Sequence, residues 1–162
     1  MGDADNDAMK NPGNARRFAA FISYSHTDAD AAAKLQRKLE RYRLPKRIAN
    51  ARANHSFALG PIFRDREDLA AATSLSAAIR DAIERAEALV VMCSPDAATS
   101  PWVAAEIALF QELHPEKPIL AALLSGEPAN AFPAALTANG NEPLAADLRP
   151  EGDSKQLSFL KI

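Results

Sequence analysis

This sequence of 162 residues has one cysteine, no long apolar run and a net charge close to zero. The single cysteine, Cys93, excludes an internal disulfide and a zinc site built from several cysteines. No apolar run approaches the roughly 20 residues that a membrane-spanning helix needs, and no signal peptide precedes Phe18. A net charge of −2 argues against a protein dedicated to nucleic acid. We therefore expect a soluble, cytoplasmic protein that contacts neither nucleic acid nor membrane directly.

The composition is that of an ordinary globular domain. Hydrophobic residues make up 48% of the chain and charged residues 25%, so wholesale disorder is not expected. The length fits one domain that is large enough to bury a core. Residues 1–15 are rich in Gly, Asp, Asn and Pro and have no periodic apolar face, which predicts a flexible tail. We therefore assign the folded domain to residues 16–162.

Basic residues are concentrated between positions 34 and 52, where eight of them accompany a single acid, Glu40. One interpretation is a solvated helix face followed by a basic loop. The other is a surface for an acidic partner, such as a neighbouring copy of the domain. The basic residues are Lys34, Arg37, Lys38, Arg41, Arg43, Lys46, Arg47 and Arg52.

Short apolar runs predict buried strands at residues 18–24, 61–63, 88–93 and 118–124. A short fifth strand is predicted over residues 144–148. The segment that follows the second strand is too charged for the core, which predicts a loop there.

Helical patterns separate these strands. Leu35 and Leu39 recur at helical spacing after Thr27 and Asp28, which can cap that helix. Because the residue before a proline is pushed out of helical geometry, Pro45 limits the helix.

Two further helices have their own start signals. An apolar stripe over residues 75–83 follows Thr73 and Ser74, either of which can be the N-cap. Ser100 followed by Pro101 predicts an N-cap and a first helical residue, in a helix that ends near His114.

The alternation of strands and helices predicts a parallel sheet with helices on both faces. Ligands of such folds bind at the carboxyl ends of the strands, so residues just after each strand are the first candidates for a site. A final helical pattern over residues 153–162 is still running where the sequence stops. We therefore expect this chain to be the front module of a longer protein.

Three blocks of sequence together resemble the TIR (Toll/interleukin-1 receptor) domain family. FISYSH at residues 21–26 is similar to the first strand of these domains, and IFRDREDL at residues 62–69 is similar to the second strand and the following BB loop. SPWVAAEI at residues 100–107 resembles the Trp-x-x-x-Glu helix of the TIR enzymes that cleave NAD. The order and spacing of the blocks fit the family from about residue 18 to residue 125.

The resemblance implies a flavodoxin-like, three-layer α/β sandwich around a central parallel sheet. It also implies one of two roles. Some TIR domains split NAD into nicotinamide and ADP-ribose or a cyclic form of it, with NAD as substrate and without a cofactor. Others only recruit further TIR domains. Bacterial members similar to this chain are effectors in antiphage defence, which act when a fused sensor domain assembles them.

Glu106 is the carboxylate that this resemblance singles out. It stands four residues after Trp102, so both project from one side of a helix, which we expect to be polar and exposed. Cleaving the bond between nicotinamide and ribose builds positive charge on the sugar, and a nearby carboxylate stabilises that charge. The alternatives are an ordinary surface glutamate at 106 and a tryptophan that only packs against the core.

Residues after the first two strands complete the predicted NAD site. Tyr24, Ser25 and His26 follow the first strand, where family enzymes line the nucleotide site. His26 stands where some relatives carry arginine. Asp65 follows the second strand at an acidic position of the family's loop, where the resemblance implies ligand binding; the alternative is a turn-forming aspartate. The rest of that loop is predicted to mediate assembly or to be solvated charge, and comprises Arg64, Arg66, Glu67, Asp68 and Leu69.

Several other chemistries lack their sequence patterns. No G-x-G-x-x-G follows a strand, and no phosphate-binding P-loop is present. The three histidines lack metal-ligand spacing, so no metal is expected. A phospho-receiver of the same topology needs an aspartate acceptor after the third strand, where Cys93 and Ser94 stand instead. The two hypotheses that remain are an NAD glycohydrolase or cyclase and a non-enzymatic TIR scaffold.

Overall fold

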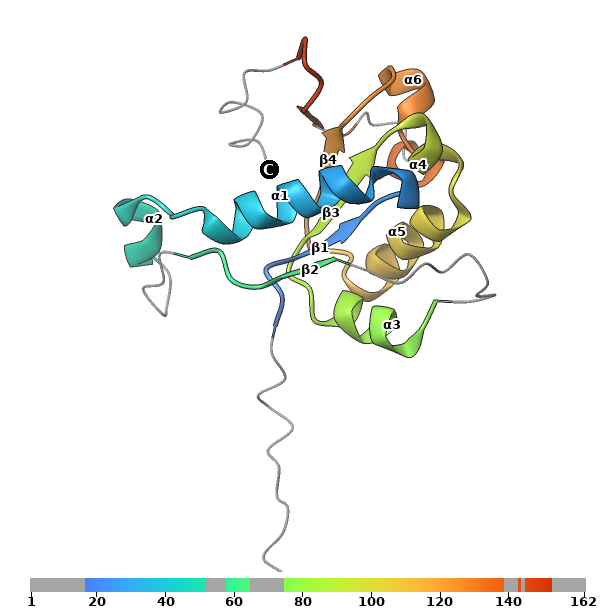
Figure 1. Cartoon of the computed structure of the whole chain (residues 1–162). Coiled ribbons are helices and arrows are strands. Elements are labelled where there is room, and N and C mark those ends of the chain that lie inside the picture. The colour runs from blue at the N-terminus through green and yellow to red at the C-terminus, as the bar shows by residue number, and fades with distance from the viewer. Residues whose placement is uncertain (1–16, 52–57, 65–74, 139–142, 144, 153–162) are drawn as a thin grey trace, which may run out of the picture.

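The computed structural model describes residues 17–51, 58–64, 75–138, 143 and 145–152. Within these residues five strands form one parallel sheet in the order β2-β1-β3-β4-β5 (Figure 1). The predicted flavodoxin-like fold is therefore confirmed. The strands are β1 Ala20–Ser23, β2 Ile62–Arg64, β3 Leu89–Cys93, β4 Ile119–Leu123 and β5 Ala145–Asp147.

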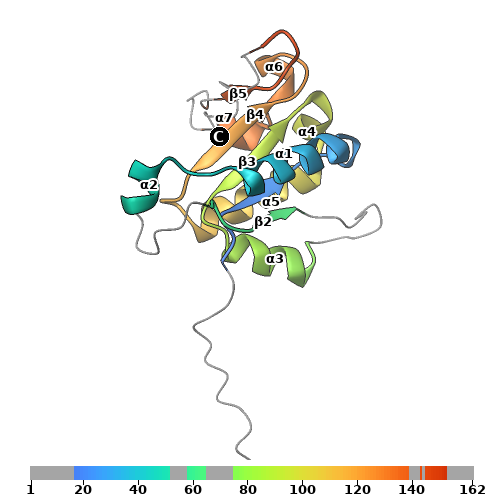
Figure 2. The same cartoon turned by 60° about the vertical axis from the view of Figure 1, so that its left-hand side comes forward.

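Helices cover both faces of the sheet (Figures 1 and 2). Helix α1 (Ala29–Arg41) packs on one face through Leu35 and Leu39. Helices α3 (Ala77–Glu84) and α5 (Pro101–Leu113) pack on the other. The shorter helical segments are η2 His26–Asp28, α2 Lys46–Ala51, α4 Pro95–Thr99, α6 Pro128–Ala131 and α7 Ala134–Thr137. No helix among the described residues is both long and apolar enough to cross a membrane.

Strand β1 lies inside the sheet, between β2 and β3, and its side chains alternate between the two helix layers. Phe21 belongs to the core on the α5 face, whereas Ala20 and Ile22 belong to the core on the α1 face. The same alternation places Ser23 on the α5 face and Tyr24 on the α1 face. This split decides which residues can form one site.

Two Ser-Pro pairs fix the chain after β3. The Ser94 hydroxyl accepts a hydrogen bond from the Ala97 N–H at 3.1 Å, and Pro95 is the first residue of α4. Ser100 ends α4 and caps α5, accepting from the Val103 N–H at 3.4 Å. The cap at Ser100 is therefore confirmed.

Some local predictions were wrong. Asp28 makes no side-chain capping bond to α1, because its carboxylate accepts a hydrogen bond from Ser94 instead. Ser76, not Thr73 or Ser74, caps α3 by accepting from the Ile79 N–H. The predicted basic loop after α1 contains a helix, α2, which lies beyond the end of α1 and away from the sheet (Figure 2). The two rejected caps, the tail over 1–15 and the helix over 153–162 lie outside the described residues.

Candidate functional site

Glu106 is a buried acid on the inner side of α5. Its residue is 5% exposed, and its helix packs on the sheet through Val103, Ile107 and Phe110. The expectation of a polar, exposed helix face was wrong, because both i+1 and i−3 from Glu106 are core positions. Burying a carboxylate is unfavourable unless donors compensate it. A buried glutamate therefore calls for a structural or functional reason, whereas a glutamate on the surface does not.

Ser23 supplies a donor to that acid. Its hydroxyl donates a short hydrogen bond to Oε2 of Glu106, over 2.5 Å. Ser23 is 1% exposed and is the last residue of β1, so the pair lies at the carboxyl edge of the sheet. Ser23 was not among the predicted site residues. A polar residue ending an otherwise apolar strand was the available signal.

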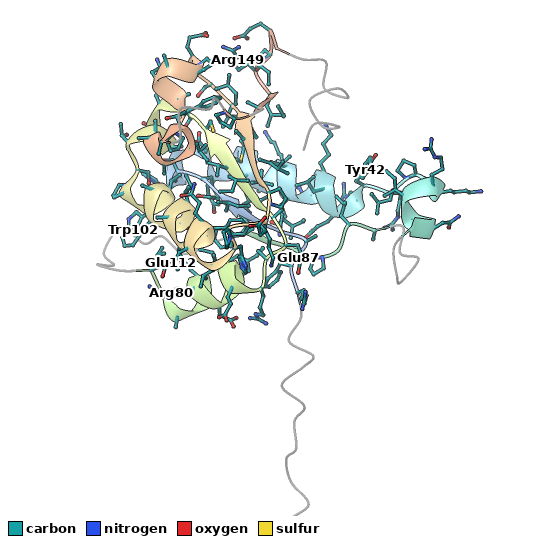
Figure 3. All side chains as sticks on the ribbon, turned by 180° about the vertical axis from the view of Figure 1, so that it is seen from behind. Tyr42, Arg80, Glu87, Trp102, Glu112 and Arg149 are labelled. Carbon is teal, nitrogen blue, oxygen red and sulfur yellow. The ribbon has the colours of Figure 1, made fainter. Side chains whose placement is uncertain are left out.

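Trp102 projects from the first turn of α5, at the helix end shown in Figure 3. Its side chain is half-buried, as a ring shared between packing and a binding surface would be. The helix carries Trp102 and Glu106 one turn apart.

Tyr24 lies on the opposite face of β1 from the acid. Its hydroxyl accepts a hydrogen bond from the Arg64 guanidinium at 3.1 Å, and the guanidinium carbon lies 5.8 Å from the ring centroid. Gln36 of α1 accepts from Nε of Arg64 at 3.1 Å and donates to the Ile62 carbonyl at 3.0 Å. Arg64, predicted within the assembly loop, therefore ends strand β2 and binds within its own chain.

The segment after Tyr24 is tied to the start of α4. The Ser94 hydroxyl donates to Asp28 at 2.6 Å, and the Thr27 hydroxyl donates to Asp96 at 2.9 Å. Ser25 is buried, with its hydroxyl 3.1 Å from that of Thr27. Burial raises the pKa of the Asp28 carboxyl above its usual 3.8; the Ser94 hydrogen bond opposes this rise and the nearby charge of Asp96 adds to it. These bonds hold the first and third strand ends together.

The remaining predicted site residues are His26 and those of the loop that follows β2. His26 is exposed at the start of η2. Asp65 and the rest of the assembly loop, Arg66, Glu67, Asp68 and Leu69, lie outside the described residues.

Other reactive groups offer less chemistry. Burial raises the pKa of the Cys93 thiol to about 12, which keeps the thiol protonated and poorly nucleophilic. Arg149 follows β5 at the carboxyl edge of the sheet (Figure 3). Its guanidinium binds the carboxylates of Asp147 and Glu127 at 2.7 and 2.8 Å. A cation so paired is a poor phosphate receptor. Within the part of the chain that is described, no group of three His, Cys, Asp or Glu residues could hold a metal ion.

Fold and site together define an α/β domain of the flavodoxin-like class, with a buried acid at the carboxyl edge of its sheet. A family model described as "TIR domain" matches residues 20–160. The chain belongs to the TIR domain family.

Two similar proteins sharpen this assignment. NAD(+) hydrolase ApTIR from Actinoplanes sp. is 38% identical over 112 residues, which are 68% of this chain and 14% of that protein. The chain thus spans about one-seventh of the length of that relative. The TIR domains of the activated Roq1 resistosome, solved while directly recognising the pathogen effector XopQ, share the fold with a TM-score of 0.50. They are 20% identical over 69% of this chain and 60% of that chain.

Proposed function

We propose that this TIR domain cleaves the bond between nicotinamide and ribose in NAD, with Glu106 as the catalytic carboxylate. The observation that carries the proposal is the buried Glu106 carboxylate, held by a serine hydroxyl at the strand edge where ligands of this fold bind. The 38% identity to an NAD(+) hydrolase supports the same substrate.

The chemistry needs little more than one placed negative charge. As the C1′–N bond breaks, its electron pair returns to the pyridine ring, so nicotinamide leaves as a neutral molecule without a general acid. The ribose becomes oxocarbenium-like, and the Glu106 carboxylate stabilises its positive charge. Water then adds to C1′ and loses a proton, which gives ADP-ribose. Attack by the adenine ring instead would give the cyclic product after the same first step.

The binding residues of the proposal come from the strand ends and from α5. Trp102 packs against the nicotinamide or ribose, while Ser25 and His26 line the nucleotide. Tyr24 and Asp65, which follow β1 and β2 in the sequence, complete the proposed set; Tyr24 would reach the ligand only from the end of its strand, because its ring lies on the α1 face. No metal or cofactor takes part.

The decisive experiment compares Glu106→Gln with Glu112→Gln. Glutamine at 106 keeps the size of the side chain and an oxygen that can accept from Ser23, but removes the charge. Glu112 lies on the same helix and is exposed, so it is a matched control (Figure 3). Nicotinamide release should fall on the order of 100-fold or more in Glu106→Gln and stay near wild type in Glu112→Gln. Equal turnover in both variants would remove Glu106 from the mechanism.

We further propose that self-assembly activates the domain, in the setting of antiphage defence and under a fused sensor domain. A carboxylate stabilises charge best where water is excluded, and a second copy docked on the strand edge would exclude it. The exposed Lys46 and Arg47 of α2 could meet the acids Asp65 and Glu67 of a neighbour. Activity per molecule should therefore rise with protein concentration. A flat value from nanomolar to high micromolar protein would show that one chain holds the whole site.

The competing proposal is a non-enzymatic scaffold that works only by TIR–TIR binding. It predicts assembly without nicotinamide release at any concentration, and Glu106→Gln would then assemble like the wild-type chain.

A further inference from the structure

We infer that Ser23 is the positioning residue for the catalytic carboxylate: its hydroxyl holds the Glu106 side chain in the orientation that the reaction needs. This inference rests on the proposed function. Ser23 is buried and donates to the acid, so in this inference it acts through Glu106 and does not contact the sugar.

The serine side of the contact is held rigidly. Ser23 is the last residue of β1, a strand with hydrogen-bonded neighbours on both sides, and its Cα is in register with that of Val91 on β3. Phe21, two residues earlier on the same face, is fully buried in the core that also contains residues of α3 and α5. A hydroxyl fixed to such a strand has little freedom to follow a moving partner.

The backbone of the acid is anchored by its helix. Val103 and Ile107 anchor α5 to the sheet, and both are fully buried. A glutamate side chain still has three rotatable bonds beyond that anchor. The Ser23 hydrogen bond, at 2.5 Å, restrains the far end of those bonds, where the charge resides. All buried side-chain nitrogen and oxygen atoms of the described residues have hydrogen-bond partners, so the pair belongs to a satisfied interior.

The Ser23–Glu106 hydrogen bond would stabilise the fold better if residue 106 were uncharged. A glutamine would fill the same space and bond the same hydroxyl without the desolvation of an anion. The chain instead retains the acid and places the Ser23 hydroxyl against it. Preorganised charge of this kind gains its effect from fixed placement, and a displacement of about 1 Å can lower a rate by on the order of 100-fold.

The experiment replaces Ser23 by Ala, Cys and Thr. Alanine removes the donor, cysteine keeps the size with a weak donor, and threonine keeps the hydroxyl on a residue that suits strands. The control is Ser76→Ala, which also deletes a hydroxyl with a defined hydrogen bond, at the start of α3 and away from Glu106. Steady-state NAD cleavage, thermal melting and the ¹³Cδ resonance of Glu106, assigned by its loss in Glu106→Gln, are measured for each variant.

We expect kcat to fall roughly 10- to 100-fold in Ser23→Ala with KM within about twofold, an intermediate value in Ser23→Cys, and recovery in Ser23→Thr. Ser76→Ala should lower the melting temperature without changing kcat. Ser23→Ala should also shift the Glu106 resonance, whereas Ser76→Ala should not. Should the alanine variant not fold, the folded cysteine variant decides by the same criteria.

The two hypotheses fail separately. Absence of NAD cleavage by the wild-type chain under every assembly condition defeats the proposed function, while the Glu106 resonance still reports whether Ser23 holds the acid. A wild-type kcat in folded Ser23→Ala or Ser23→Cys overturns the positioning role. So does an unmoved Glu106 resonance, or a loss of kcat that threonine fails to restore.

Discussion

Ser23 and Tyr24 are neighbours in sequence, but their side chains lie on opposite faces of the sheet and hold charges of opposite sign. On the α5 face, Ser23 donates to the carboxylate of Glu106, which is almost fully buried. On the α1 face, the Tyr24 hydroxyl accepts from the guanidinium of Arg64, which is only half-buried.

The two contacts have different energetic origins. Arg64 lies near solvent and joins an edge strand to α1 through Gln36, so its bonds serve the fold at little desolvation cost. Glu106 loses nearly all its hydration and accepts from the Ser23 hydroxyl, and burying a carboxylate costs more than burying an uncharged side chain of the same size. A charge retained where it is unfavourable points to chemistry, whereas a charge bound near the surface points to architecture.

The largest effect is expected for Glu106→Asp, which keeps the charge but withdraws it by one methylene. If the α5 face depends on placement, nicotinamide release should fall about 100-fold while the melting temperature changes by a few degrees. Initial rates at saturating NAD measure this. An aspartate variant with wild-type kcat would show that the α5 face, like the α1 face, is mainly structural.

Trp102→Ala should reduce both stability and activity, because the half-buried ring in the first turn of α5 is proposed to serve both packing and substrate binding. Loss of a half-buried indole should lower the free energy of unfolding by about 2 kcal/mol, less than the 3–5 kcal/mol of a fully buried one. Trp102→Phe should retain more stability than activity. Urea unfolding and nicotinamide release, run in parallel, check both. An alanine variant that unfolds normally but cleaves nothing would assign the ring to substrate alone.

Gln36→Met tests the α1 face alone. The change removes the amide that bonds both Arg64 and the Ile62 carbonyl, so the free energy of unfolding should fall by about 1 kcal/mol. Because Gln36 is remote from Glu106 across the sheet, kcat should stay within about twofold of wild type. Unfolding by urea and NAD cleavage test the two halves of this expectation. A tenfold loss of kcat without loss of stability would contradict the division between the faces.

The smallest effect is expected for Asp28→Asn, and it depends on pH. The folded pKa of Asp28 is raised, so the folded state binds its proton more tightly than the unfolded state does. Its stabilising contribution is therefore present below pH 3.8 and is lost as the pH rises through the folded pKa. Asparagine still accepts from Ser94 and carries no charge. The variant's advantage in unfolding free energy should grow toward neutral pH, by less than about 1 kcal/mol. A constant difference from acid to neutral pH would contradict the raised pKa.

Local residue patterns predict much of the fold. The run at 88–93 becomes β3 because β-branched and apolar residues can be buried on both faces of a parallel strand. Ser100 and Pro101 start α5 because a hydroxyl acceptor and a fixed φ suit those positions wherever they occur. Helices α2 and α4, of six and five residues, were missed because neither is long enough to show a helical period.

The site was less predictable, because it depends on which face each residue occupies. Glu106 could be identified by its spacing from Trp102, but its burial required the orientation of α5 on the sheet. Ser23 looked like the polar end of a strand until the register placed it opposite the acid. Asp28 looked like a helix cap until Ser94, 66 positions away, proved to be its partner.

The Ser23–Glu106 contact joins residues that are 83 positions apart. Closing so long a loop costs chain entropy, which is offset only when the sheet is complete. The elements β3, α4, α5 and β4 are close in sequence and can associate early. A partly refolded chain can therefore contain every helix of the active face before Ser23 has reached the acid. In refolding from urea, we expect helical circular dichroism to recover before NAD cleavage does. The return of activity would then report the docking of strand β1 into the sheet.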